Sequence, residues 1–224
     1  MTTPLQLVLG FGHEVSFSRD DFLEGPSNAA ALALVERWPD WPAHIVVLTG
    51  PEGSGKSHLA DIWASRAGAR RLSARALDQA AVPVALATGA LSLESVADGL
   101  DEVALFHLLN LAKEQDAYVL LTARRAPALW AIRLPDLASR VRALPVVELS
   151  SPDDTLLRAV LVKLFVDRQL AVDESLIGYL TTRIERSFAA ARAAVGLLDR
   201  EALRRQRPVT RALAVELLGN SNDY

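Results

Sequence analysis

Hydrophobic positions follow two different spacings along this chain of 224 residues. Some runs are short and mostly apolar, in most cases with β-branched residues, and such runs are typical of buried strands. They lie at 44–50, 89–95, 117–123 and 144–150. Longer segments between them carry apolar residues three and four positions apart, which predicts helices. These helical segments lie at 29–38, 56–68, 73–81 and 101–115.

The alternation of buried strands with helices predicts the α/β class, with a parallel sheet covered by helices on both faces. Asp101 suits a helix N-cap and Gly68 suits a helix stop. After Ser151 the pattern changes, because each segment has helical period and none reads as a strand. The sequence therefore predicts an extended tail, an α/β domain and a small all-helical domain, at 1–12, 13–150 and 151–224.

Bulk composition narrows the class of protein. Half of the residues are apolar and 23% are charged, which is ordinary for a soluble globular chain. The net charge of −3 gives no electrostatic reason to expect strong direct binding of nucleic acid. No apolar run approaches the roughly 18 residues of a membrane span, and the N-terminus lacks the basic region of a signal peptide. Without cysteine there is no disulfide and no thiolate metal site, so a cytoplasmic protein is expected.

The stretch "GPEGSGKS" at 50–57 satisfies the pattern G-x-x-x-x-G-K-[ST] of a phosphate-binding loop. Its glycines let successive backbone N–H groups turn toward phosphate oxygens, and the helix that follows points its N-terminus at the anion. Lys56 would reach the β and γ phosphates, and the Ser57 hydroxyl would complete a Mg²⁺ shell. The expected ligands are ADP or ATP with Mg²⁺; the alternative is a glycine turn that binds nothing. The residues expected to contact the nucleotide here are Gly50, Pro51, Glu52, Gly53, Ser54, Gly55, Lys56, Ser57 and His58.

Three segments carry a resemblance to a known family. "DDFLEGPSNAAALALV" at 20–35, "GPEGSGKSHLA" at 50–60 and "LPDLASRV" at 134–141 resemble the DnaA-like branch of the AAA+ ATPases. The chain ends where DnaA initiators would begin a DNA-binding domain, and that form is similar to the Hda-type regulators that inactivate the initiator. The resemblance implies an AAA+ α/β domain with a helical lid, and a role in the control of replication initiation.

The resemblance also implies roles for individual residues. Arg140 falls on the family's arginine finger, a cation inserted into a neighbouring subunit's nucleotide site; the alternative is an ordinary surface arginine near a helix end. Phe22, Leu23 and Asn28 fall where the family encloses the adenine.

Two positions at the end of the 89–95 strand depart from the family pattern. Glu94 stands where the family has a magnesium-binding aspartate, and Ser95 stands where it has a second acid. A glutamate can still hold Mg²⁺ directly or through water. A serine cannot orient the attacking water as a carboxylate does. The sequence therefore predicts nucleotide binding with weak or absent hydrolysis at this chain's own site.

The positions where the family has residues that sense the nucleotide also differ from the family pattern. Arg124 lies where the family often has an acidic sensor, which leaves Thr122 as the contact for the γ phosphate. Ala189 lies where the lid's sensor arginine is expected, and Arg186 or Arg192 could substitute for it.

The N-terminal "QLVLGF" at 6–11 has one amide-bearing side chain followed by apolar ones. Extended peptides of this kind bind by placing alternate side chains in pockets. Gln6, Leu7, Leu9 and Phe11 resemble the family's peptide for the DNA polymerase sliding clamp. The alternative is that the segment packs on its own domain as an edge strand.

Three functions are compatible with these features. The first is a regulator that docks on the sliding clamp and promotes ATP hydrolysis by the DnaA initiator through Arg140, as a monomer or a homodimer. The second is an AAA+ loader or adaptor that delivers another replication protein to DNA. The third is a P-loop kinase for a small molecule, which the all-helical C-terminal domain and "LASRV" disfavour.

Overall fold

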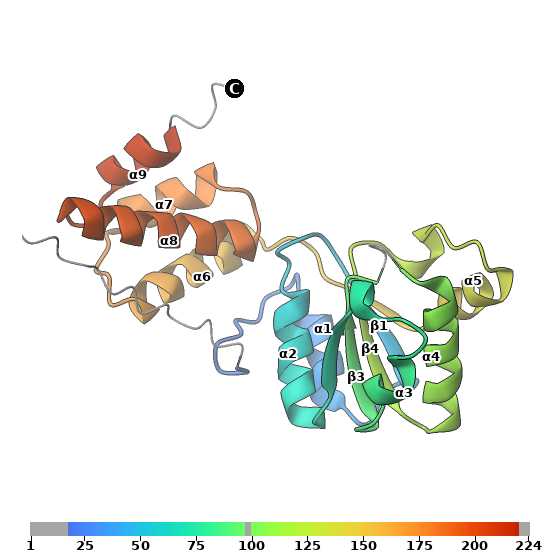
Figure 1. Ribbon diagram of the computed structural model, residues 1–224. Coiled ribbons are helices and arrows are strands. Elements are labelled where there is room, and N and C mark those ends of the chain that lie inside the picture. The colour runs from blue at the N-terminus through green and yellow to red at the C-terminus, as the bar shows by residue number, and fades with distance from the viewer. Residues whose placement is uncertain (1–17, 97–99, 220–224) are drawn as a thin grey trace, which may run out of the picture.

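The computed structural model describes residues 18–96 and 100–219. Figure 1 shows a sheet flanked by helices and, beside it, a group of helices formed by the C-terminal third of the chain. The expected tail at 1–12 lies outside the described residues.

The sheet has five strands in the order β2-β3-β4-β1-β5, and its neighbouring strands are all parallel. The strands are β1 Ile45–Thr49, β2 Arg70–Ser73, β3 Ala90–Glu94, β4 Tyr118–Ala123 and β5 Val146–Glu148. The central strands β1 and β4 are buried over almost their whole length, which explains why their sequences show no polar face. The predicted α/β class with a parallel sheet is confirmed.

Helices cover both faces of this sheet. They are α1 Ala29–Arg37, α2 Lys56–Ala67, α3 Val82–Ala85, α4 Glu102–Glu114 and α5 Pro135–Arg142. Helices α1 and α2 pack with Leu48 and Leu120 in one core, whereas α3, α4 and α5 pack with Val47 and Leu121 in the other. Because successive strand residues point to opposite faces, the strands β1, β3 and β4 each supply both cores.

The sequence predicted several helix ends correctly. Asp101 caps α4, because its side chain accepts the N–H groups of Val103 and Ala104 at 3.0 Å each. Gly68 ends α2 in the left-handed conformation, with φ +61°.

The prediction of a helix at 73–81 is wrong. That segment holds only the 3₁₀ turn Ala74–Ala76, and α3 begins at Val82. The Asp78 side chain accepts the Ala81 N–H at 2.8 Å, a local turn that competes with helix formation. Strand β2 was not predicted, because this edge strand is mostly exposed and begins with two arginines.

The C-terminal helices form a unit with a core of their own, here called the lid. They are α6 Asp154–Asp167, α7 Glu174–Arg183, α8 Phe188–Arg205 and α9 Arg211–Leu218. Each begins at a side chain that accepts a backbone N–H, and these caps are Asp153, Asp173, Ser187 and Thr210. The prediction that the chain after Ser151 is helical is confirmed for the described residues. None of the helices within 18–96 and 100–219 has the length and apolarity needed to cross a membrane.

Candidate functional site

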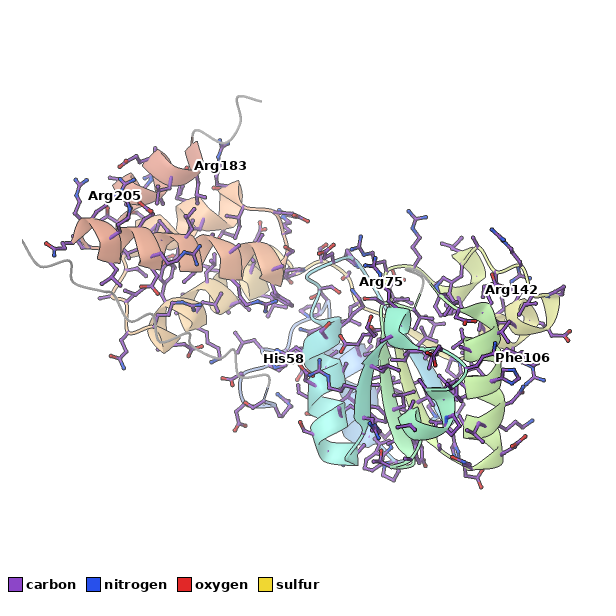
Figure 2. The ribbon with its side chains drawn as sticks, in the orientation of Figure 1. His58, Arg75, Phe106, Arg142, Arg183 and Arg205 are labelled. Atoms are coloured by element: carbon purple, nitrogen blue, oxygen red, sulfur yellow. The ribbon has the colours of Figure 1, made fainter. Side chains whose placement is uncertain are left out.

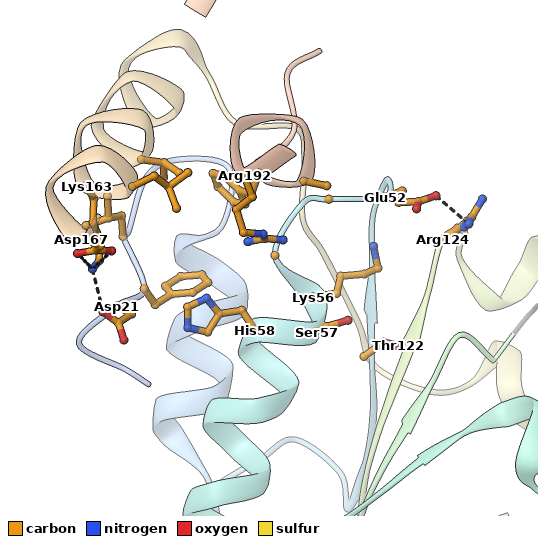
Figure 3. A pocket seen from close by; sticks show the side chains of 18 of the residues that line it. Asp21, Glu52, Lys56, Ser57, His58, Thr122, Arg124, Lys163, Asp167 and Arg192 are labelled. Atoms are coloured by element: carbon orange, nitrogen blue, oxygen red, sulfur yellow. Dashed lines mark hydrogen bonds and ion pairs between the residues drawn. The ribbon is translucent and has the colours of Figure 1, made fainter. Parts of the chain in front are cut away.

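A cavity of about 540 Å³ lies where the phosphate-binding loop meets the lid (Figure 3). Its walls come from the segment before α1, the start of α2, the ends of β3 and β4, and the lid helices α6 and α8. Pockets for small ligands and cofactors typically measure about 300–1,000 Å³, so the volume suits a nucleotide-sized ligand.

The loop at 50–57 has the open backbone that its sequence predicts. Gly53 and Gly55 have φ angles of +72° and +101°, values that residues with a side chain rarely adopt. The chain then enters α2 at Lys56, and the first N–H groups of a helix have no partner within it. This end of the cavity therefore presents backbone donors, a suitable surface for an anion.

Lys56 lies across this loop. Its Nζ donates to the carbonyl oxygens of Gly50 and Pro51 at 2.8 and 2.6 Å. Burial lowers the pKa of Lys56, and the nearby cation of Arg124 lowers it further. Arg124 itself pairs with Glu52 at 2.8 Å. A bound anion would offset both effects and favour the charged amine.

The lid contacts the loop directly. The Phe188 N–H at the start of α8 donates to the Gly53 carbonyl at 2.8 Å. A Cβ atom on Gly53 would lie 2.8 Å from the Ser187 Cβ and 3.0 Å from the Ala189 Cβ. Residue 189, the expected sensor position, thus lies beside the loop, and its side chain is exposed.

Arg192 lies one turn further along α8 and lines the cavity. Figure 3 shows its guanidinium reaching from the lid toward the start of α2, above His58. Burial lowers its pKa, and it forms no hydrogen bond or ion pair within 18–96 and 100–219. Arg186, the other possible substitute, pairs with Asp154 at 2.9 Å and does not line the cavity.

Phe22, Leu23 and His58 form an apolar part of the wall. The Phe22 and His58 rings meet edge to face with centroids 5.1 Å apart. The His58 Nε2 lies 2.9 Å from the Ser18 carbonyl oxygen, and burial is the main cause that lowers the pKa of this imidazole. This surface suits a flat aromatic group such as a base.

Asn28, which was expected beside the adenine, does not line the cavity. It is buried. Its Oδ1 accepts the Gly25 N–H at 2.9 Å, and its Nδ2 donates to the Leu23 carbonyl at 3.0 Å. Asn28 therefore fixes the turn that carries Phe22 and Leu23 rather than contacting the cavity itself.

An ion pair that the sequence did not indicate connects the lid to the segment before α1. Lys163 on α6 contacts Asp21 at 2.8 Å and Asp167 at 2.9 Å (Figure 3). Asp21 and Lys163 are 142 positions apart in the chain, so no local pattern could have joined them.

Of the two expected magnesium ligands, only one lines the cavity. Ser57 lines the cavity, but Glu94 does not; its Oε1 lies 2.9 Å from the Arg71 Nη2. Arg71 also pairs with Asp61, whose pKa is raised, mainly by burial. Ser95 lines the cavity and donates its N–H to the Thr122 Oγ1 at 3.2 Å.

The carboxylates that do line the cavity are all in ion pairs. Asp21 and Asp167 contact Lys163, and Glu52 contacts Arg124. Among the described residues no three His, Cys, Asp or Glu side chains converge on a metal position. Protein-bound Mg²⁺ usually has one or two carboxylate ligands besides phosphates and water. The cavity therefore fits a nucleotide, but its side chains do not fit a magnesium ion held by the protein.

Arg140 lies outside the cavity. It is exposed on α5, where Nη1 donates to the Asn110 Oδ1 and the guanidinium lies over the Phe106 ring. Figure 2 labels Phe106 and Arg142 at this end of the molecule and His58 at the end that faces the lid. The structure thus separates Arg140 from this chain's own cavity. Gln6, Leu7, Leu9 and Phe11 lie outside the described residues.

Comparison with known proteins identifies the fold. No family model matches the chain. A protein of Haemophilus influenzae described only as uncharacterized is 31% identical over 110 residues, which are 49% of this chain. The matched segment spans about half of that relative, 48% of its length.

Solved structures match over much more of the chain. Domain III of the Thermotoga maritima replication initiation protein DnaA has a TM-score of 0.76 at 16% identity, covering 93% of this chain and 98% of that one. AMPPCP-bound DnaA from Aquifex aeolicus has a TM-score of 0.65 at 19% identity, covering 85% and 68%. The RuvB Holliday junction branch migration motor of T. maritima has a TM-score of 0.72 at 18% identity. That match covers 91% of this chain and 72% of the RuvB chain. At these identities the likeness shows the fold, which is the AAA+ fold of DnaA domain III.

Proposed function

We propose that this chain is a nucleotide-binding AAA+ regulator of chromosomal replication initiation, which activates ATP hydrolysis by the DnaA initiator. One observation carries the proposal: the chain has a nucleotide-sized cavity where the 50–57 loop meets the lid, while Arg140 is exposed and does not line that cavity. A cation so placed is available to a neighbouring molecule's nucleotide, not to this chain's own.

Nucleotide binding rests on the residues that line the cavity. Backbone N–H groups at the start of α2 and the amine of Lys56 would hold the phosphates. Arg192 would reach them from the lid, replacing the sensor arginine that Ala189 lacks. Phe22 and His58 would hold the base. Binding of AMPPCP by a DnaA of the same fold supports this assignment.

Hydrolysis at this site is proposed to be weak or absent. Ser95 and Thr122 line the cavity where a carboxylate would have to position water. Their hydroxyl groups are neutral at physiological pH and are poor general bases. In this proposal ADP or ATP serves to join loop and lid, because the polyanion would contact Lys56 on one side and Arg192 on the other.

Activation of the partner rests on Arg140. A guanidinium supplied in trans stabilises charge on the transferring phosphoryl group, an effect worth about 10³–10⁵ in rate where an arginine finger acts. The clamp peptide, Gln6 to Phe11, would bring the chain to the sliding clamp on DNA, where the initiator would meet it.

A mixed hydrolysis assay tests this function. DnaA initiator loaded with labelled ATP is incubated with sliding clamp loaded on DNA, with and without the full chain. We expect release of phosphate from the initiator to rise at least about tenfold when the chain is present. No stimulation, together with no binding to the clamp, would contradict the regulator and leave the loader or adaptor as the better function.

A further inference from the structure

Glu94, the last residue of β3, is held by the side chain of Arg71 on the neighbouring strand β2. Its Oε1 lies 2.9 Å from the Arg71 Nη2, and Arg71 Nη1 pairs with Asp61 on α2. The register explains the contact. Arg71 of β2 lies opposite Ser92 of β3, so it is on the same face of the sheet as Glu94, two residues further on.

Two carboxylates with little exposure to solvent share the contact with Arg71. The Asp61 side chain is only 9% exposed and the Glu94 side chain 20%, so both carboxylates are largely removed from water. Arg71 is the cation that both share. The Arg71 side chain is itself 48% exposed, but moving Glu94 away would break one of the two charge-assisted contacts of Arg71.

The cavity supplies positive charge in place of a metal. Five cations and three carboxylates line it, and each of those carboxylates is in an ion pair. Lys56 belongs to the phosphate-binding loop itself, and Arg192 is on α8, whose first residue Phe188 donates its N–H to the Gly53 carbonyl at 2.8 Å. Phosphate oxygens that meet these cations and the N–H groups of α2 have less need of a divalent ion for charge compensation.

We propose that Arg71 keeps Glu94 out of the cavity, so that this chain binds nucleotide without a protein-held magnesium ion. The inference rests on the proposed nucleotide site, and it makes Arg71 a positioning residue. Free nucleotide, which carries more negative charge than its magnesium complex, should bind as well as that complex or better.

Calorimetric titration of the full chain with ATP tests this directly, once with excess Mg²⁺ and once with EDTA. The expected result is an affinity in EDTA within about threefold of that in Mg²⁺, or higher. An affinity at least tenfold higher in Mg²⁺ would overturn the inference while leaving the nucleotide site intact. No binding under either condition would contradict the proposed function itself, and the inference with it.

A pair of variants tests the role of Arg71. Arg71→Met removes the cation that contacts Glu94, and Asp61→Asn removes the buried carboxylate that would otherwise lose its ion-pair partner. Glu94 is then free to reach the cavity. We expect this variant to gain a preference for Mg²⁺ of about tenfold, and added Glu94→Gln to abolish that preference. Arg70→Met is the matched control, since Arg70 is next in the strand and points to the other face.

Two outcomes would contradict the proposed role of Arg71. If the variant gains no preference for Mg²⁺, Arg71 does not keep Glu94 from the cavity. If Glu94→Gln alone, in the presence of Arg71, lowers the affinity measured in Mg²⁺ but not in EDTA, Glu94 already holds the ion. Circular dichroism on each variant separates these results from a failure to fold.

Discussion

The guanidinium carbon of Arg140 lies 4.8 Å from the centroid of the Phe106 ring. The same side chain donates from Nη1 to the Asn110 Oδ1, and both partners are on α4. A cation over an aromatic face is held by the ring's negative surface, which limits the rotamers of a long side chain. Arg140 is therefore exposed but oriented, as suits a residue that meets a partner's phosphates.

On the proposed function, Arg140→Ala should reduce the stimulated hydrolysis by the initiator at least about tenfold, because it would remove the cation proposed to meet the transferring phosphoryl group. The chain's own affinity for ATP should stay the same, since Arg140 does not line the cavity. Arg142→Ala is the control, being exposed on the same helix. Equal effects of the two substitutions would indicate a general loss of surface charge instead of a finger.

Lys56→Ala should lower the affinity for ADP at least about tenfold, because hydrogen bonds from a charged donor contribute about 1.5–3 kcal/mol. Calorimetry measures the change. Lys113→Ala, an exposed lysine on α4, serves as the control and should bind ADP normally. Unchanged binding in Lys56→Ala would exclude the loop as the phosphate site.

Periodicity and local motifs predicted much of the fold. Apolar runs predicted four of the five strands, and the side chain of Asp101 caps α4 as its sequence indicates. Strand β2 was missed because an exposed edge strand needs no apolar face, and "RRLS" offers almost none. The segment 73–81 was mistaken for a helix, since composition does not reveal that Asp78 forms a turn.

The sequence predicted only those parts of the candidate site whose residues are close together in the chain. The spacing of Gly50, Gly55 and Lys56 identifies the loop from eight consecutive residues. The contact between Arg71 and Glu94 depends on strand order, and the ion pair of Lys163 depends on how the lid packs. Contacts of this kind, between residues far apart in the chain, are seen only in the folded structure.

Gly53→Ala should destabilise the chain more than an ordinary glycine substitution, because its Cβ would meet Ser187 and Ala189. Gly89→Ala is a matched control: Gly89 has φ +73°, close to the +72° of Gly53, but nothing lies within 4 Å of its Cβ position. Urea unfolding should show a loss of about 1–2 kcal/mol for Gly89→Ala, from the left-handed backbone alone. Gly53→Ala should lose a further 1–3 kcal/mol or so from overpacking, and equal losses would mean that the lid does not press on the loop.

Gln6→Ala combined with Leu7→Ala should abolish binding to the sliding clamp, since the peptide would lose its amide and its first apolar side chain. The melting temperature should barely move. Thr2→Ala with Thr3→Ala, in the same segment but outside the motif, is the control. A large fall in melting temperature of the first variant would favour the edge-strand alternative.

Glu102 should make stability depend on pH. Its carboxylate accepts the Arg133 N–H at 3.0 Å and the Leu134 N–H at 2.9 Å, which ties α4 to the turn before α5. The hydrogen bond from Arg133, followed by that from Leu134, lowers the pKa of Glu102 below its ordinary value of 4.5. A lowered pKa in the folded state means that the unfolded chain takes up the proton first. The stabilisation is therefore present above pH 4.5 and is lost as the pH falls through the folded-state value.

Urea unfolding of the unmodified chain and of Glu102→Gln, at about pH 7 and about pH 3, measures this contribution. Glu102→Gln should be the less stable protein at the higher pH, because an amide oxygen is a weaker acceptor than a carboxylate. At the lower pH the two should converge, since a protonated glutamate and a glutamine carry the same charge. Glu114→Gln, an exposed position at the other end of α4, is the control for a change of net charge. A difference between the chains that stays constant with pH would show that the two backbone contacts do not depend on the charge of Glu102.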